Sequence, residues 1–136
     1  MQFITSNLFP IAIAFMSGGM LLWSFFGGKI RGVQQVDANA ALQLINRKDA
    51  FVLDVRESNE FKTGHIVNAK LIPLGKLSER VSELEKYRDQ PILVVCRSGN
   101  RSGSACGILA KQGFTQVYNL AGGMMSWQNN NLPSVK

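Results

Sequence analysis

The chain has 136 residues and a formal net charge of +6, and 46% of its residues are hydrophobic. That length suffices for one domain with a hydrophobic core and a small appendage. Two cysteines exclude a disulfide-stabilised scaffold, one histidine without a CxxC pair argues against a metal site, and the scattered basic residues argue against a nucleic-acid-binding face.

The first part of the chain is predicted to cross a membrane. No residue before Lys29 is charged, and residues 8–26 are 19 residues of which 14 are apolar. As a helix this segment would be about 28 Å long, close to the roughly 30 Å of a bilayer core. Because basic flanking residues stay cytoplasmic, Lys29 and Arg31 predict a single-pass protein with its remaining chain in the cytoplasm. We therefore expect three parts: an anchor (1–28), a linker (29–32) and a domain (33–136).

Two other interpretations of the apolar segment are weaker. A cleaved signal peptide could use Ser17 and Gly19 as the small residues of its cleavage site. However, the segment lacks a basic start, and the apolar run continues past that site as MLLWSFF. A helix buried inside the protein is disfavoured because a domain of about 100 residues has little room for a helix that is apolar on all sides.

The first half of the domain alternates between strand-like and helix-like segments. Residues 33–36 (VQQV) are a short strand, and Asp37 is a good N-cap for a helix. That helix would place on one face its apolar residues Ala38, Ala41, Leu42 and Ile45. Residues 51–55 (FVLDV) are typical of a buried parallel strand, and residues 69–74 predict another strand that Pro73 stops.

The second half repeats this alternation. Ser78 is predicted to cap a helix whose apolar residues are Leu77, Val81 and Leu84. Residues 92–95 (ILVV) are the most strand-like of the chain. A helix over 102–112 would bury Ala105, Ile108 and Leu109 and end at Gly113. Finally, residues 116–120 predict a strand and residues 122–127 (GGMMSW) open a closing helix.

This order predicts an α/β domain with a mainly parallel sheet and helices on both faces. In such sheets the functional site lies beyond the carboxyl ends of the strands. Cys96 directly follows the strand over 92–95, and Asp54 and Arg56 lie where the strand over 51–55 ends. These residues are therefore expected at one edge of the sheet, together with the segment LAGG at 120–123.

Cys96 is the strongest candidate for a nucleophile. Its loop lies over the start of the next helix, where free N–H groups and the helix dipole attract anions. Gly99 permits a tight turn, and Arg97 and Arg101 add positive charge. This field is expected to lower the thiol pKa, so that a thiolate can attack an anionic electrophile. The alternative, an inert buried cysteine, suits Cys106 better, because Cys106 lies on the apolar side of the following helix.

The segment CRSGNRS (96–102) resembles the active-site loop of the rhodanese family of sulfurtransferases. Two further segments agree with that family, LDVRESNEFKTGHIVNAKLIPL (53–74) and VYNLAGGMMSW (117–127), and the resemblance covers about residues 33–132. It implies a rhodanese-like fold in which Cys96 carries sulfur as a persulfide. The loop that holds this sulfur would be Arg97, Ser98, Gly99, Asn100, Arg101 and Ser102.

The resemblance also implies the reaction and its partners. The donor would be thiosulfate or a related anion, and the acceptor a thiol or cyanide, with no metal and no organic cofactor. Asp54 and Arg56 match a D-x-R motif and are interpreted as a pair that braces the loop. Glu60 is expected to be an ion-pair partner in the same network, and His65 a packing residue rather than a base. Trp127 is expected to anchor the core.

Two alternatives remain open at this point. The first is a persulfide carrier or partner-binding module that does not turn over. The second is an enzyme similar to cysteine phosphatases or arsenate reductases, which use the same strand, anion loop and helix. Phosphatases place the arginine after C-x5, whereas here Arg101 follows Cys96 after four residues, in a shorter loop.

Overall fold

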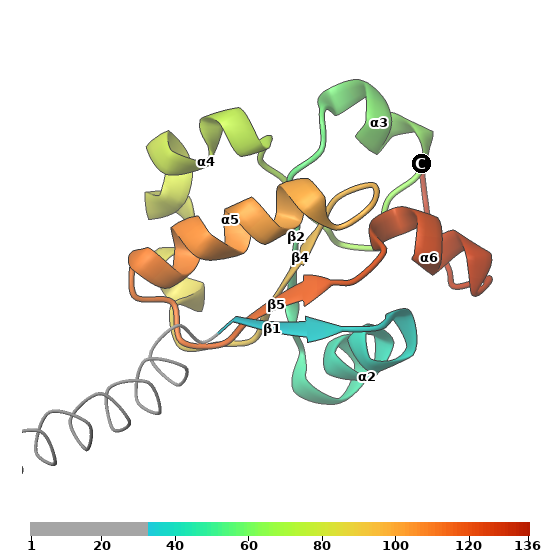
Figure 1. The fold of residues 1–136 in the computed structure, drawn as a ribbon, viewed down its shortest axis with the longest axis horizontal. Helices are drawn as coiled ribbons and strands as arrows, with labels where there is room; N and C mark the ends of the chain where they lie inside the picture. Colours follow the sequence, from blue (N-terminus) through green and yellow to red (C-terminus); the bar gives the residue numbers. More distant parts are fainter. Residues whose placement is uncertain (1–32) are drawn as a thin grey trace, which may run out of the picture. The chain divides into compact units, whose positions relative to one another are not determined.

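The structure is a computed structural model that describes residues 33–136 (Figure 1). Its centre is a five-stranded sheet in which every neighbouring pair of strands is parallel. From one edge to the other, the strands are β1 (Val33–Val36), β5 (Val117–Leu120), β4 (Ile92–Val95), β2 (Phe51–Asp54) and β3 (Lys70–Leu71). All five strands fall within segments predicted as strands.

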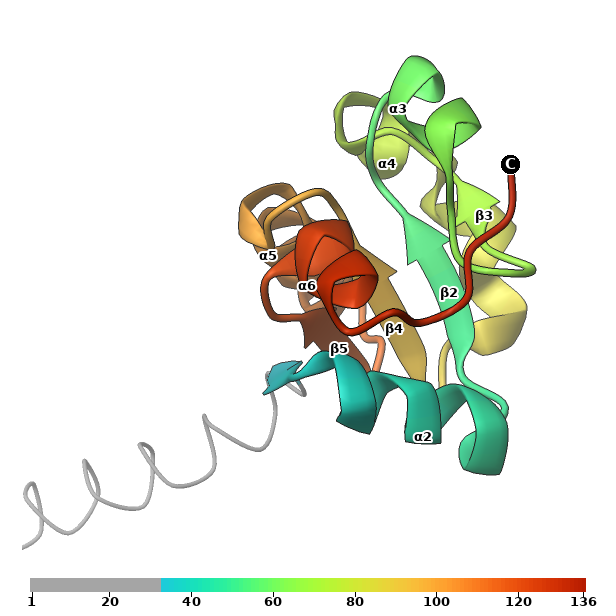
Figure 2. The same ribbon diagram turned by 90° about the vertical axis from the view of Figure 1, so that its right-hand side faces the viewer.

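Helices cover both faces of the sheet, as predicted (Figures 1 and 2). One face packs against α4 (Leu74–Arg80), the 3-10 helix η1 (Val81–Tyr87) and α5 (Asn100–Lys111). The other face packs against α2 (Ala38–Lys48) and α6 (Gly123–Asn129). A short helix, α3 (Ser58–Thr63), follows the carboxyl end of β2.

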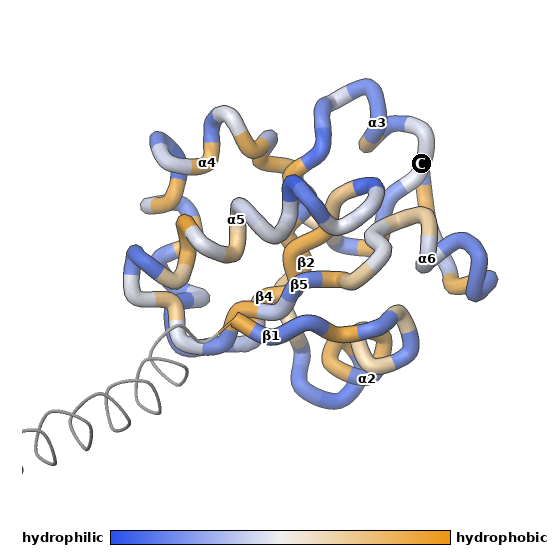
Figure 3. Tube along the Cα trace, viewed as in Figure 1, coloured by the Kyte–Doolittle hydropathy of each residue, from blue (hydrophilic) through white to orange (hydrophobic). Residues whose placement is uncertain are grey.

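The central strands supply most of the core because their side chains alternate between the two faces. In β4 all four residues are buried: Ile92 and Val94 face α4 and α5, whereas Leu93 and Val95 face α2 and α6. Figure 3 shows this hydrophobic centre. Trp127 of α6 is 1% exposed, which confirms it as a core residue.

The start of α2 confirms the predicted cap. The Asp37 carboxylate accepts a hydrogen bond of 2.7 Å from the Ala40 N–H, which satisfies one of the free donors of the first turn. The buried residues of α2 are Ala38, Ala41 and Leu44. Of the predicted apolar face, Leu42 and Ile45 are only partly buried and pack against the same cluster, whereas Leu44 was not predicted and is buried.

Three boundaries differ from the prediction. Ser78 does not cap a helix: it lies inside α4, which begins at Leu74 directly after Pro73. α5 begins at Asn100 rather than at Ser102, because Gly99 adopts the left-handed conformation at its N-cap. α3 was not predicted, because none of its residues is buried and it therefore has no apolar stripe.

The predicted anchor at residues 8–26 lies outside the described residues. Within residues 33–136, no helix is both long enough and apolar enough to span a bilayer.

Candidate active site

The parallel register brings the predicted site residues to one edge of the sheet. Asp54 at the end of β2 lies beside Val95 of β4, and Val94 lies beside Asn119 of β5. Cys96 follows Val95 directly and is 0% exposed. The chain then turns through Arg97, Ser98 and Gly99 and enters α5.

The Cys96 sulfur lies within hydrogen-bond reach of its own loop. The Gly99 N–H donates to Sγ at 3.0 Å, and the Ser102 Oγ lies 3.3 Å from Sγ. Burial raises the pKa of the Cys96 thiol, but hydrogen bonds from the Ser102 hydroxyl and from the N–H groups of Ser102, Gly99 and Ser98 outweigh that effect. The net result is a lowered pKa, as the sequence predicted.

The causes of this lowering match the prediction in part: the loop N–H groups contribute as expected, whereas the arginines do not dominate. Hydrogen bonds dominate it, not the arginines, because the Arg101 guanidinium points to another partner. Its Nη1 and Nη2 atoms bind the Glu60 Oε1 and Oε2 atoms at 2.6 and 2.9 Å. This hydrogen bonding lowers the pKa of Glu60 to about 2. Glu60 is therefore an ion-pair partner, as expected, and it neutralises much of the Arg101 charge.

Asp54 and Arg56 form a buried pair at the end of β2. The Arg56 Nη2 lies 2.7 Å from the Asp54 Oδ2, and the Arg56 Nε donates to both carboxylate oxygens at 3.0 Å. Arg56 also donates to the carbonyl oxygens of Gly64 at 2.8 Å and Glu60 at 3.3 Å, both in or next to α3. The pair thus holds α3, and through Glu60 it braces the Arg101 side of the loop.

The first turn of α6 donates two backbone hydrogen bonds to the Cys96 loop. The Met124 N–H donates to the Cys96 carbonyl at 2.8 Å, and the Met125 N–H to the Arg97 carbonyl at 3.1 Å. Gly123 permits this approach: a Cβ there would lie 2.3 Å from the Cys96 carbonyl oxygen. Its φ of +57° is also in the left-handed region that favours glycine.

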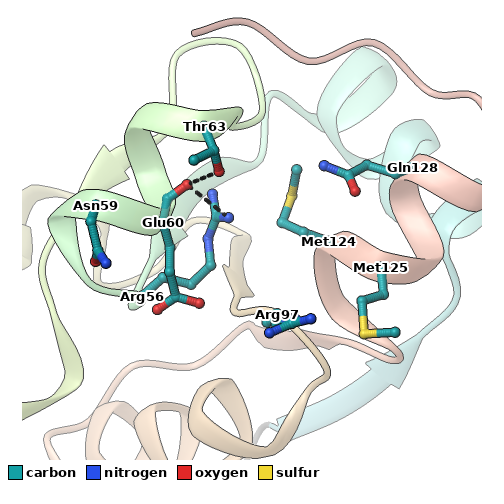
Figure 4. Close-up of a pocket in the computed structure, with 8 residues that line it drawn as sticks. All are labelled: Arg56, Asn59, Glu60, Thr63, Arg97, Met124, Met125 and Gln128. Atoms are coloured by element: carbon teal, nitrogen blue, oxygen red, sulfur yellow. Dashed lines mark hydrogen bonds between the residues drawn. The ribbon is translucent and has the colours of Figure 1, made fainter.

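A pocket of about 300 Å³ opens beside the loop (Figure 4). Its charged lining residues are Arg56, Glu60 and Arg97, and its apolar ones are Met124 and Met125. Among residues 33–136, Arg97 belongs to no ion pair and is exposed. Met125 is also 49% exposed. The pocket therefore offers an exposed cation and an apolar wall to a bound molecule.

The remaining predicted residues fall into three groups. Ser98 is exposed on the loop, and Asn100 is exposed at the first residue of α5. Cys106 is buried in α5, and burial, followed by the nearby Cys96, raises its pKa to about 12. His65 stacks on Phe61 and its Nδ1 lies 2.9 Å from the Phe61 carbonyl, away from the sulfur's hydrogen bonds. In the part of the chain that the structure describes, no group of His, Cys, Asp and Glu side chains could hold a metal ion.

One residue of the site had no sequence signal. Asn119 of β5 is 4% exposed, and its amide binds Ser102, Gly99 and Gln35. Ser102 in turn contacts the Cys96 sulfur. An isolated asparagine in a strand is a weak clue by itself; its place beside β4, one residue before the LAGG turn, is what brings it to the loop.

Comparisons with known proteins agree with this arrangement. A family model for the rhodanese-like domain matches residues 37–130. The Escherichia coli (strain K12) protein YibN is 38% identical over 105 residues, which are 76% of this chain and 73% of YibN. The thiosulfate sulfurtransferase GlpE of Vibrio cholerae is 35% identical over 98 residues, 72% of this chain and 91% of GlpE. The crystal structure of a rhodanese-related protein from Thermoplasma volcanium has a TM-score of 0.68 and 35% identity, covering 75% of this chain and 97% of that one.

Proposed function

The chain belongs to the rhodanese-like domain family, and from that premise we propose that it is a sulfurtransferase that moves sulfane sulfur through Cys96. The observation that carries the proposal is the loop itself. It directs N–H groups and a hydroxyl at one cysteine sulfur and lowers the pKa of that thiol. Such a sulfur is ionised more readily than a free thiol, and once ionised it needs no separate base.

In the first half-reaction, the Cys96 thiolate attacks the outer sulfur of thiosulfate. A new S–S bond forms, and the old S–S bond breaks with its electron pair going to sulfite, which leaves as the dianion. Cys96 is left as a persulfide with its negative charge on the outer sulfur. The N–H groups of the loop, of which that of Gly99 contacts Sγ, are expected to stabilise that charge as it develops.

In the second half-reaction, an acceptor thiolate attacks the outer sulfur of the persulfide. The acceptor becomes a persulfide, and Cys96 leaves as a thiolate. The same hydrogen bonds that lower the pKa of Cys96 favour this departure, because they stabilise the thiolate form. Cyanide can take the place of the thiol as acceptor.

Two observations support thiosulfate, a small dianion, as the donor. The exposed Arg97 lines the pocket beside the loop and is in no ion pair of the described residues, so its charge is available to an anion. The Vibrio cholerae relative is itself a thiosulfate sulfurtransferase.

The geometry favours sulfur transfer over phosphatase chemistry. A phosphatase needs a guanidinium directed at the phosphate oxygens. Here Arg101 lies in the first turn of α5 and its guanidinium binds Glu60, away from the centre of the loop.

The full protein is proposed to be membrane-anchored, with its rhodanese domain on the cytoplasmic side. The support is the uncharged apolar segment at 8–26 and the basic residues Lys29 and Arg31 that follow it. The tether would confine sulfur delivery to acceptors at or near the membrane surface.

The direct test is the intact mass of the full chain after exposure to thiosulfate, with Cys96→Ser and Cys106→Ser as matched variants. We expect the wild type and Cys106→Ser to gain the mass of one sulfur atom and Cys96→Ser to gain none. No gain in a folded wild type with a free thiol would contradict the proposal. A gain without subsequent turnover on cyanide would instead identify a persulfide carrier.

A further inference from the structure

The orientation of the Asn119 amide is fixed by its neighbours. Its Nδ2 lies 3.2 Å from the carbonyl oxygen of Gly99 and 3.0 Å from the Oε1 of Gln35. A backbone carbonyl can only accept hydrogen bonds, so the amide nitrogen must face Gly99. The Asn119 Oδ1 therefore faces the Ser102 hydroxyl, and it too can only accept.

This orientation determines where the Ser102 proton lies. A serine hydroxyl has one proton to donate, and the close contact with the Asn119 Oδ1 takes it. The Ser102 oxygen then presents lone pairs to the Cys96 sulfur, 3.3 Å away. Lone pairs suit a thiol, which can donate its S–H. The inner sulfur of a persulfide has no proton and, being neutral, accepts hydrogen bonds only weakly, so it does not need a donor. Lone pairs do not suit a thiolate, which needs a donor.

We propose that Asn119 is a positioning residue that competes with the Cys96 sulfur for the single proton of the Ser102 hydroxyl. This role rests on the proposed sulfur transfer through Cys96. While the sulfur is neutral, the hydroxyl donates to Asn119. When the sulfur is a thiolate, before attack on the donor or after release to the acceptor, the hydroxyl rotates and donates to the sulfur. The proton stays on Ser102 throughout, and only its hydrogen bond changes.

Other ionisable groups surround Cys96 but do not reach the Ser102 hydroxyl. Arg97 is on the loop, the Asp54–Arg56 pair is at the end of β2, and the Arg101–Glu60 pair joins α5 to α3. Cys106 lies on α5, and α6 contains no charged residue. The hydrogen-bond partners of Ser102 Oγ among the described residues are Cys96 and Asn119. Among the described residues, the Ser102 hydroxyl can therefore donate its hydrogen bond either to the Asn119 Oδ1 or to the Cys96 sulfur.

The test compares Asn119→Leu with the wild type in the full chain, both in a Cys106→Ala background. The measurement is the rate of Cys96 alkylation by iodoacetamide across pH, followed by intact mass. Loss of the Asn119 acceptor frees Ser102 to donate to the sulfur, so Asn119→Leu is expected to react about threefold faster below the titration midpoint. If Asn119 only holds Gly99 in place, its loss would slow the reaction instead, because the Gly99 N–H would leave the sulfur.

Two further variants isolate the Ser102 proton. Gln35→Leu removes the outer partner of Asn119 and leaves the Oδ1 contact in place, so its alkylation profile should match the wild type. In a Ser102→Ala background, Asn119→Leu should have no further effect, because the shared proton is gone. An equal effect of Asn119→Leu with and without Ser102 would overturn the proposal.

Two safeguards keep this test decisive. Asn119→Val, whose side chain suits a strand, replaces Asn119→Leu if thermal unfolding shows that the leucine variant does not fold. Alkylation does not depend on sulfur transfer, so failure to gain sulfur from thiosulfate would count against the proposed function alone. An unchanged or slower alkylation of the folded variant would count against the role of Asn119 alone.

Discussion

Glu60 and Arg101 are 41 positions apart in the sequence, yet they form the two-point ion pair that flanks the Cys96 loop. The Arg101 guanidinium is the main reason that the pKa of Glu60 falls from 4.5 to about 2 in the folded protein. A carboxylate with a lowered pKa stabilises the folded state fully above its ordinary pKa. That stabilisation is then lost as the pH falls through the folded-state value. For Glu60 the window runs from pH 4.5 down to about 2.

Replacing the Glu60 carboxylate is predicted to change the free energy of unfolding in a pH-dependent way. Glu60→Gln is expected to lower the free energy of unfolding by about 1 kcal/mol at neutral pH, as partly exposed ion pairs do. The difference from the wild type should shrink between pH 4.5 and about 2, because the wild-type carboxylate becomes protonated there. Urea unfolding at a series of pH values measures it. Glu79→Gln is the matched control, since Glu79 is exposed and has no ion pair within residues 33–136. If the difference between the wild type and Glu60→Gln stays constant with pH, the lowered pKa of Glu60 is refuted.

At the residue scale, the sequence predicted which side chains gather at the site better than it predicted their partners. Cys96, Asp54 and Arg56 follow strands, and the ends of parallel strands meet at one edge. The partner of Arg101 depends on where α3 lies, and α3 has no apolar pattern to reveal it. Asn119 reaches Ser102 only because β5 lies next to β4, which is a matter of strand order and not of local sequence.

At the element scale, the junction between α6 and the Cys96 loop depends on one glycine. Gly123→Ala would add a Cβ 2.3 Å from the Cys96 carbonyl oxygen and 2.5 Å from the Arg97 carbonyl carbon, both backbone atoms. It would also place alanine at a φ of +57°. We expect a loss of about 3 kcal/mol in the free energy of unfolding, together with loss of sulfur uptake, because the loop must move.

The matched control for this change lies on α5. At Gly107 a Cβ would meet nothing within 4 Å, and the residue is exposed in the middle of the helix. Gly107→Ala should therefore raise the free energy of unfolding by about 0.5–1 kcal/mol and leave sulfur uptake unchanged. Chemical denaturation and intact mass measure both variants. A Gly123→Ala protein as stable and active as the wild type would show that the loop does not depend on this contact.

Helix boundaries were the least predictable feature of the elements. Ser78 is a good capping residue, but α4 starts four residues earlier, where Pro73 ends the extended segment. Leu77, Val81 and Leu84 are buried as expected, although they belong to two successive helices rather than one. Apolar spacing therefore identified the buried face but not the point at which the backbone changes from α-helix to 3-10 helix.

At the scale of the whole molecule, the first described residue and the Cys96 loop lie at opposite ends of the parallel sheet. The chain enters the described domain at Val33, at the amino end of β1. The Cys96 loop lies at the carboxyl ends of the strands, because every pair in the sheet is parallel. Val33 therefore lies at the end of the sheet opposite the Cys96 loop.

The proposed anchor at residues 8–26 predicts that the full chain is held in a membrane. If residues 8–26 span a membrane, the full chain should stay with the membrane fraction after an alkaline carbonate wash and keep its full mass of 15.0 kDa. Deletion of residues 1–28 should release it, because this change removes the whole apolar segment. The deletion variant should still take up sulfur from thiosulfate, since no residue of the Cys96 loop is removed. Recovery of a shortened chain cut near Ser17 or Gly19 would instead identify a cleaved signal peptide. Such a cut would also contradict the cytoplasmic orientation, because a cleaved signal peptide directs the chain across the membrane.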